Sequence, residues 1–85
     1  MNAQREAVQS REAIQTLVRR ILDNTGDRRA FTDQDSLVLS GRLDSIDVIE
    51  VITFVEENFG ADFADDGFNQ AELDSVDKIL ARVSR

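Results

Sequence analysis

Apolar residues recur along this chain with helical spacing in three separate stretches. In the first stretch they fall at i, i+3, i+4, i+7 and i+8, which is one face of an amphipathic helix. The three stripes are Ile14, Leu17, Val18, Ile21 and Leu22; Val48, Val51, Ile52, Val55 and Phe59; and Val76, Ile79, Leu80 and Val83. Because the strong apolar spacings are helical and the chain has no proline, the pattern predicts an all-α fold around one core.

Polar residues at the ends of the first and last stripes indicate where those helices stop and start. The first helix is predicted over about residues 3–24, since Asn24 and Gly26 offer a C-terminal stop. The last helix is predicted to begin near Asp74 or Ser75, which are residue types that cap helix N-termini.

The central helix has the clearest boundaries, from about Ser45 to Phe59. Asp44 is the expected N-cap, and Asp47 adds negative charge where the helix dipole is positive. Gly60 can adopt the left-handed conformation that ends a helix.

Residues 25–43 form a long connection, which is longer than most loops and is therefore expected to have a function or local structure. Its expected contacts with the core are Leu37 and Leu39, with Phe31 as a third. Such contacts would hold the end of the loop against the start of the central helix.

Residues 61–70 are acidic and are broken by Gly67. They predict a turn plus one short helical turn around residues 65–68, with Phe63 and Phe68 in contact with the core. Three main helices and this short one predict a small four-helix bundle with a long first loop.

The length of 85 residues predicts a single domain over residues 1–85 with a modest core. There is no cysteine to form a disulfide or a thiolate metal site, and the expected metal content is none. No apolar run approaches the ~18 residues of a membrane span, and the N-terminus lacks the apolar segment of a signal peptide. We therefore expect a cytoplasmic monomer that does not bind membranes.

Seventeen acidic and ten basic residues give a net charge of −7. This charge disfavours nucleic acids and anionic lipids, and it favours basic protein partners through electrostatic steering. The alternative interpretation is that the charge only keeps a small protein soluble.

The central helix carries more apolar residues than one core-facing stripe requires. Ile46, Ile49 and Phe54 widen the stripe, so some of them should face a neighbouring helix, a bound ligand or a partner protein.

Asp44-Ser45-Ile46 opens this helix, follows Gly41-Arg42-Leu43 and precedes Glu50, Glu56-Glu57 and Phe59-Gly60. In this small acidic helical chain, the combination resembles the acyl carrier protein family, including its peptidyl and aminoacyl relatives. The usual motif is Asp-Ser-Leu, and Ile46 is a conservative replacement for the leucine. The resemblance implies an acyl-carrier-protein-like four-helix bundle.

The resemblance also implies a function. A phosphopantetheinyl transferase, using coenzyme A and Mg²⁺, would attach 4′-phosphopantetheine to Ser45. The arm would carry an acyl or aminoacyl group as a thioester, in fatty-acid, polyketide or nonribosomal peptide biosynthesis. Partners would be a loading ligase and downstream synthases or transferases with basic docking surfaces.

Carrier proteins use exposed apolar residues just after this serine for partner contact, which by position are Ile46 and Ile49. The acidic surface presented to partners would comprise Asp44, Asp47, Glu50 and Glu56. The alternatives are that the isoleucines belong to the core and that the acidic residues are an ordinary solvated helix face.

The motif occurs twice, as Leu43–Ile49 (LDSIDVI) and as residues 73–79 (LDSVDKI). Helix capping alone accounts for the second copy, and the resemblance places the modified serine on the second helix. We therefore favour Ser45 over Ser75.

The chain is not expected to be an enzyme. A serine nucleophile needs a nearby base, and the chain has no histidine and no Gly-x-Ser-x-Gly turn. A calcium loop around Asp62 and Asp66 is rejected because Leu73 stands where the bidentate glutamate is required. The alternative function is an unmodified acidic adaptor that binds a partner helix in an apolar groove.

Overall fold

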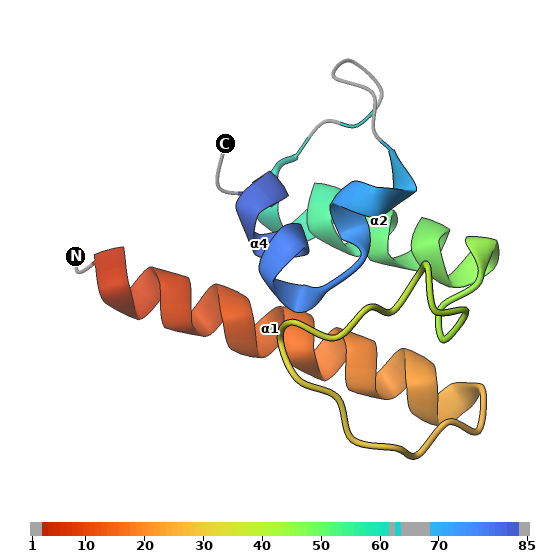
Figure 1. The fold of residues 1–85 in the computed structure, drawn as a ribbon. Helices are drawn as coiled ribbons and strands as arrows, with labels where there is room; N and C mark the ends of the chain where they lie inside the picture. The colour runs from red at the N-terminus through yellow and green to blue at the C-terminus, as the bar shows by residue number, and fades with distance from the viewer. Residues whose placement is uncertain (1–2, 62, 64–68, 84–85) are drawn as a thin grey trace.

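A computed structural model of the chain describes residues 3–61, 63 and 69–83. They form the α-helices α1 (Ala3–Asn24), α2 (Ser45–Phe59) and α4 (Val76–Val83) and the 3-10 helix η1 (Gln70–Leu73) (Figure 1). This part of the chain contains no β-strand, which confirms the all-helical prediction. The short helical turn expected at residues 65–68 lies outside the described residues.

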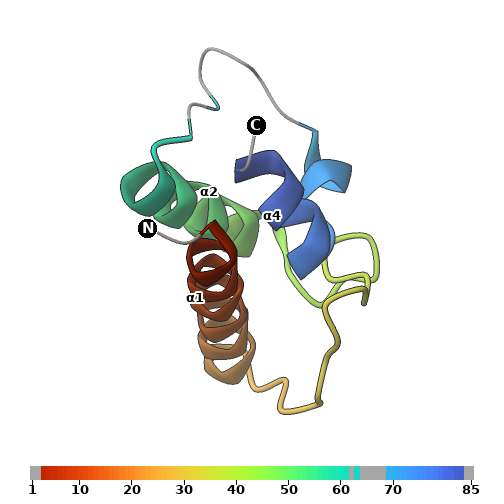
Figure 2. The ribbon, with the colours of Figure 1, turned by 90° about the vertical axis from the view of Figure 1, so that its left-hand side faces the viewer.

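The helices α2 and α4 lie side by side across α1, as the two views in Figures 1 and 2 show. All five residues of the α1 stripe are at most 2% exposed. Burying each such aliphatic side chain contributes about 1.5–3 kcal/mol. The core residues are Ile14, Leu17, Val18, Ile21, Leu22, Leu37, Leu43, Val48, Val51, Val55, Phe63, Leu73, Val76 and Ile79.

The C-terminus of α1 confirms the predicted stop. Gly26 has a φ of +88°, which a residue with a side chain rarely adopts. Its N–H donates to the carbonyl of Asp23 at 3.1 Å, and the N–H of Asp27 donates to the carbonyl of Leu22 at 2.8 Å. This pair of bonds satisfies the last carbonyls of the helix and turns the chain into the long loop.

The long loop then runs back beside α1 to the start of α4 (Figure 1). The Arg11 guanidinium of α1 lies 2.6 Å from both the Asp33 and the Asp77 carboxylates. The N–H of Asp77 also donates to the carbonyl of Asp33 at 3.0 Å. The middle of the loop is therefore held by α1 and by the first turn of α4 together.

Only part of the predicted loop contact with the core is correct. Leu37 is fully buried and Phe31 packs at the margin of the core, but Leu39 is 69% exposed. The prediction for Leu39 was wrong because the chain turns after Leu37. The N–H of Gly41 donates to the carbonyl of Val38 at 3.0 Å, so residues two apart do not share a face here.

The helix α4 begins at Val76, next to the predicted start. Ser75 is its cap: the Ser75 hydroxyl accepts the N–H of Lys78 at 3.1 Å and its carbonyl accepts the N–H of Ile79 at 2.9 Å. The preceding 3-10 helix η1 was not predicted. Asn69 caps η1 by accepting the N–H of Ala71 at 2.7 Å.

Candidate functional site

Ser45 is the first residue of α2, and its side chain is exposed. Asp44 is the N-cap, with extended backbone, and its carboxylate accepts the N–H of Asp47 at 2.8 Å. The Asp47 carboxylate in turn accepts the N–H of Asp44 at 3.1 Å. This reciprocal capping box fixes the backbone on both sides of Ser45. None of the described residues forms a hydrogen bond with the Ser45 hydroxyl, and the residue is exposed.

Asp47 has a structural role in the capping box. This residue is only 9% exposed, although the sequence placed it on an acidic docking surface. Burial raises the pKa of the Asp47 carboxyl, and the negative charges of Asp44 and Glu50 raise it further. The structure therefore places Asp47 in the helix cap, whereas Asp44 and Glu50 are exposed.

Two acidic candidates further along α2 have partners within the chain. The Glu50 carboxylate lies 3.2 Å from the guanidinium of Arg20 on α1, in an exposed ion pair. The Glu56 carboxylate accepts the N–H of Phe63 at 3.3 Å, beyond the C-terminus of α2. Glu56 is therefore engaged at the far end of the helix from Ser45.

Three large apolar side chains are exposed, two of them in the first turns of α2 and one in the loop that leads to it. Ile46 is 74% exposed, Ile49 is 62% exposed and Leu39 is 69% exposed. The expectation that the isoleucines face outward is confirmed, and the alternative that they belong to the core is wrong. We refer to Leu39, Ile46 and Ile49 as the apolar patch.

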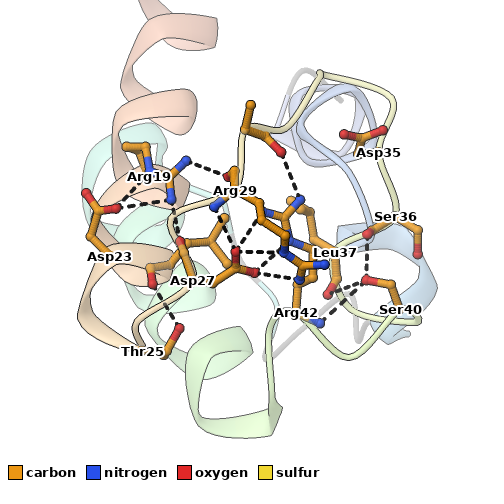
Figure 3. Close-up of polar contacts among 12 residues, drawn as sticks. Arg19, Asp23, Thr25, Asp27, Arg29, Asp35, Ser36, Leu37, Ser40 and Arg42 are labelled. Atoms are coloured by element: carbon orange, nitrogen blue, oxygen red, sulfur yellow. Dashed lines mark hydrogen bonds and ion pairs between the residues drawn. The ribbon is translucent and has the colours of Figure 1, made fainter.

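An arginine cluster, Arg29 and Arg42 around the Asp27 carboxylate, closes the loop before Ser45. The Arg42 guanidinium lies 2.8 Å from the Asp27 carboxylate and also donates to the carbonyl of Arg29 at 2.9 Å (Figure 3). Hydrogen bonds from Arg29 and Arg42 hold the pKa of the Asp27 carboxyl well below its usual range. The two ends of the loop are thus joined directly before α2.

A shallow, open depression of about 340 Å³ adjoins this cluster. Its lining includes Ser40, Arg42, Asp44 and Asp47, so it reaches the N-terminal turn of α2. The lining carries both positive and negative groups.

Ser75 has the opposite environment from Ser45. It is 4% exposed, and its hydroxyl is occupied in capping α4. The structure therefore separates the two copies of the motif, since only the first presents its serine at the surface.

No cluster of three or more potential metal-binding side chains occurs among the described residues. Half of the rejected calcium loop, residues 62 and 64–68, lies outside the described part of the chain. Of the two motif serines, Ser45 is the candidate site residue, because it is exposed at the start of α2.

Within the described ranges, no helix is long and apolar enough to cross a membrane. No protein-family model, curated protein or solved structure matches the chain. The comparisons therefore assign no family to the chain.

Proposed function

We propose that this chain is a carrier protein of the acyl carrier type, with a 4′-phosphopantetheine arm attached to Ser45. The arm would carry an acyl or aminoacyl group as a thioester. The observation that carries the proposal is the exposed Ser45 hydroxyl at the start of α2, beside the exposed Ile46. The order of α1, a long loop, α2 and α4 among the described residues supports the proposal.

The surroundings of Ser45 are compatible with a phosphodiester at this position. The N-terminus of a helix carries a partial positive charge and favours an anionic group. The Asp44 carboxylate opposes that effect, but it is exposed and therefore well screened by solvent. The thiol would belong to the arm, which is consistent with a chain that has no cysteine.

The chain itself supplies no base for the attachment. It has no histidine, and none of the described residues accepts a hydrogen bond from Ser45. A phosphopantetheinyl transferase with Mg²⁺ would supply the activation. The Ser45 oxygen forms a bond to the phosphorus that bears the pantetheine, the pyrophosphate bond of coenzyme A breaks, and adenosine 3′,5′-bisphosphate leaves. The serine proton passes to a base of the transferase.

Partner enzymes would recognise the apolar patch together with the exposed acidic side chains of Asp44 and Glu50. An apolar centre with a polar rim is typical of protein interfaces, and a few central residues supply most of the affinity. The partners would be the transferase, a loading ligase and downstream synthases or transferases with basic docking surfaces.

The test is incubation of the purified protein with coenzyme A, Mg²⁺ and a broad-specificity phosphopantetheinyl transferase, followed by intact-mass measurement. We expect one phosphopantetheinyl group per chain in the wild type and in Ser75→Ala, and none in Ser45→Ala. A folded wild-type protein that gains no mass would contradict the proposal and favour the unmodified adaptor.

A further inference from the structure

The carboxylate of Asp74 is buried, but it does not cap the helix α4 that follows it. The cap of α4 is Ser75, whose hydroxyl accepts the N–H of Lys78. Asp74 directly precedes that cap and is 6% exposed. A buried charge is costly unless other groups satisfy it, so its partners identify what it does.

All of these partners lie in the long loop. One oxygen of the Asp74 carboxylate accepts the hydroxyl of Ser36 at 3.0 Å and the N–H groups of Val38 and Leu39 at 2.8 Å each. The main-chain carbonyl of Asp74 accepts the N–H of Leu37 at 2.6 Å. Four consecutive loop residues are therefore attached to one residue that lies more than thirty positions later in the sequence.

The attached segment leads directly to Ser45. The carbonyl of Leu37 accepts the N–H of Leu43 at 2.7 Å, which closes residues 37–43 into a compact loop. The Ser40 hydroxyl strengthens the turn by donating to the carbonyl of Ser36 at 2.7 Å (Figure 3). Leu43 is followed by the N-cap Asp44, so this loop carries Leu39 and ends at the candidate site.

We propose that Asp74 is a positioning residue that holds the exposed Leu39 in place in the loop that ends at Ser45, and so sets how partner enzymes recognise the carrier. This inference rests on the proposed function. With Asp74 in place, the loop is ordered before a partner arrives. Without it, the N–H groups of Val38 and Leu39 lose their acceptor, and a partner must order the loop during binding.

The inference predicts a change in KM rather than in kcat. Asp74→Ala leaves Ser45 and its capping box intact, so the chemical step at the hydroxyl is unaffected. We expect the KM of the carrier in phosphopantetheinyl transfer to rise about fivefold, equivalent to about 1 kcal/mol, with kcat unchanged. Asp74→Asn retains an oxygen at the same position and should restore most of the affinity. Glu57→Ala, an exposed change elsewhere on α2, is the matched control.

A double-mutant cycle tests whether Asp74 acts through Leu39. Leu39→Ala alone should raise KM by a similar factor, and the variant with both changes should be no worse than either single variant. Additive effects would show that Asp74 acts by another route and would overturn the inference. A wild-type KM in a folded Asp74→Ala protein would also overturn it.

Amide hydrogen exchange supplies a readout that needs no transferase. In the wild type, the amides of Val38 and Leu39 should be protected, and in Asp74→Ala they should exchange rapidly while the α1 core amides stay protected. Unprotected Val38 and Leu39 amides in the wild type would overturn the inference even if the Asp74→Ala variant failed to fold. A wild type that is never modified but shows this protection pattern would contradict the proposed function and leave the loop attachment standing.

Discussion

Ser45 and Ser75 occupy the same position in two similar heptapeptides, yet Ser45 is exposed and Ser75 is 4% exposed. The difference comes from the residue that caps each helix. Asp44 caps α2, so Ser45 is its first residue, whereas Ser75 itself caps α4. A shift of one residue rotates a helix by about 100° relative to its sequence. The same seven-residue pattern therefore presents a hydroxyl in one place and buries it in the other.

The two serines should differ in their contribution to stability. Ser75→Ala removes the side-chain cap of α4 and should lower the free energy of unfolding by about 1 kcal/mol. Ser45→Ala removes an exposed hydroxyl without an intramolecular partner and should change it by less than about 0.5 kcal/mol. Urea unfolding followed by circular dichroism measures both, and equal losses would contradict the assignment of Ser75 as the cap.

Leu37 and Leu39 form a second matched pair, two residues apart in one loop. Leu37→Ala leaves a cavity in the core and should cost about 2–5 kcal/mol. Leu39→Ala truncates a side chain that is 69% exposed and should change stability by less than about 0.5 kcal/mol. The unfolding midpoints of the two variants decide the point, and a large loss for Leu39→Ala would mean that this side chain is buried in solution.

The apolar patch should matter for recognition and not for folding. Ile46→Glu places a charge where a partner surface is expected, and we predict about a tenfold rise in KM for phosphopantetheinyl transfer, equivalent to about 1.4 kcal/mol. Far-UV circular dichroism should be unchanged because Ile46 is 74% exposed. Thr53→Glu, an exposed change further along α2, is the control. An unchanged KM in the Ile46→Glu variant would show that Ile46 does not contribute to docking.

Acid should destabilise the fold through carboxylates that hold the loop. Burial raises the pKa of Asp74, but hydrogen bonds from Leu39, Ser36 and Val38 outweigh it and leave the pKa lowered. Hydrogen bonds from Arg11 and Gln34 lower the pKa of Asp77. Because these pKa values lie below those of the unfolded chain, the stabilisation is complete above the unfolded value of about 3.9 and is lost as the pH falls through the folded values.

The measurement is urea unfolding at a series of pH values from about 6 to about 2. The Asp77→Asn variant should lose less stability over this range than the wild type, since it lacks one of the groups that must be protonated. The raised pKa of Asp47 acts in the opposite direction, because protonation of this carboxyl as the pH falls stabilises the folded chain. Wild-type stability that is constant or rises below about pH 4 would contradict the roles of Asp74 and Asp77.

The helices could be predicted from sequence because their signals are local. The stripe of Ile14 to Leu22, the cap at Asp44 and the glycines at 26 and 60 each act within a few residues of themselves, and α1 and α2 have the predicted bounds. The exposed Ser45 follows from the same local signals. The relative arrangement of α1, α2 and α4 depends on contacts that no local pattern specifies.

The loop could not be predicted in the same way. The N–H groups of the buried Leu37 and the exposed Leu39 both donate to Asp74, which is distant in sequence. Asp74 itself looked like an ordinary capping residue, because a capping pattern does not show which of two adjacent polar residues the helix uses. The residue that binds the loop, Asp74, therefore lies in the second copy of the motif, where its sequence position indicates only helix capping.

The central claim is that an outside enzyme modifies the hydroxyl of Ser45, and the most direct test is to locate that modification within the chain. Wild-type protein is incubated with coenzyme A, Mg²⁺ and the transferase, digested, and analysed by fragment-ion mass spectrometry. We predict phosphopantetheine on Ser45 alone, with Ser36, Ser40 and Ser75 unmodified. Modification at any other serine, or none in a protein shown to be folded, would contradict the account.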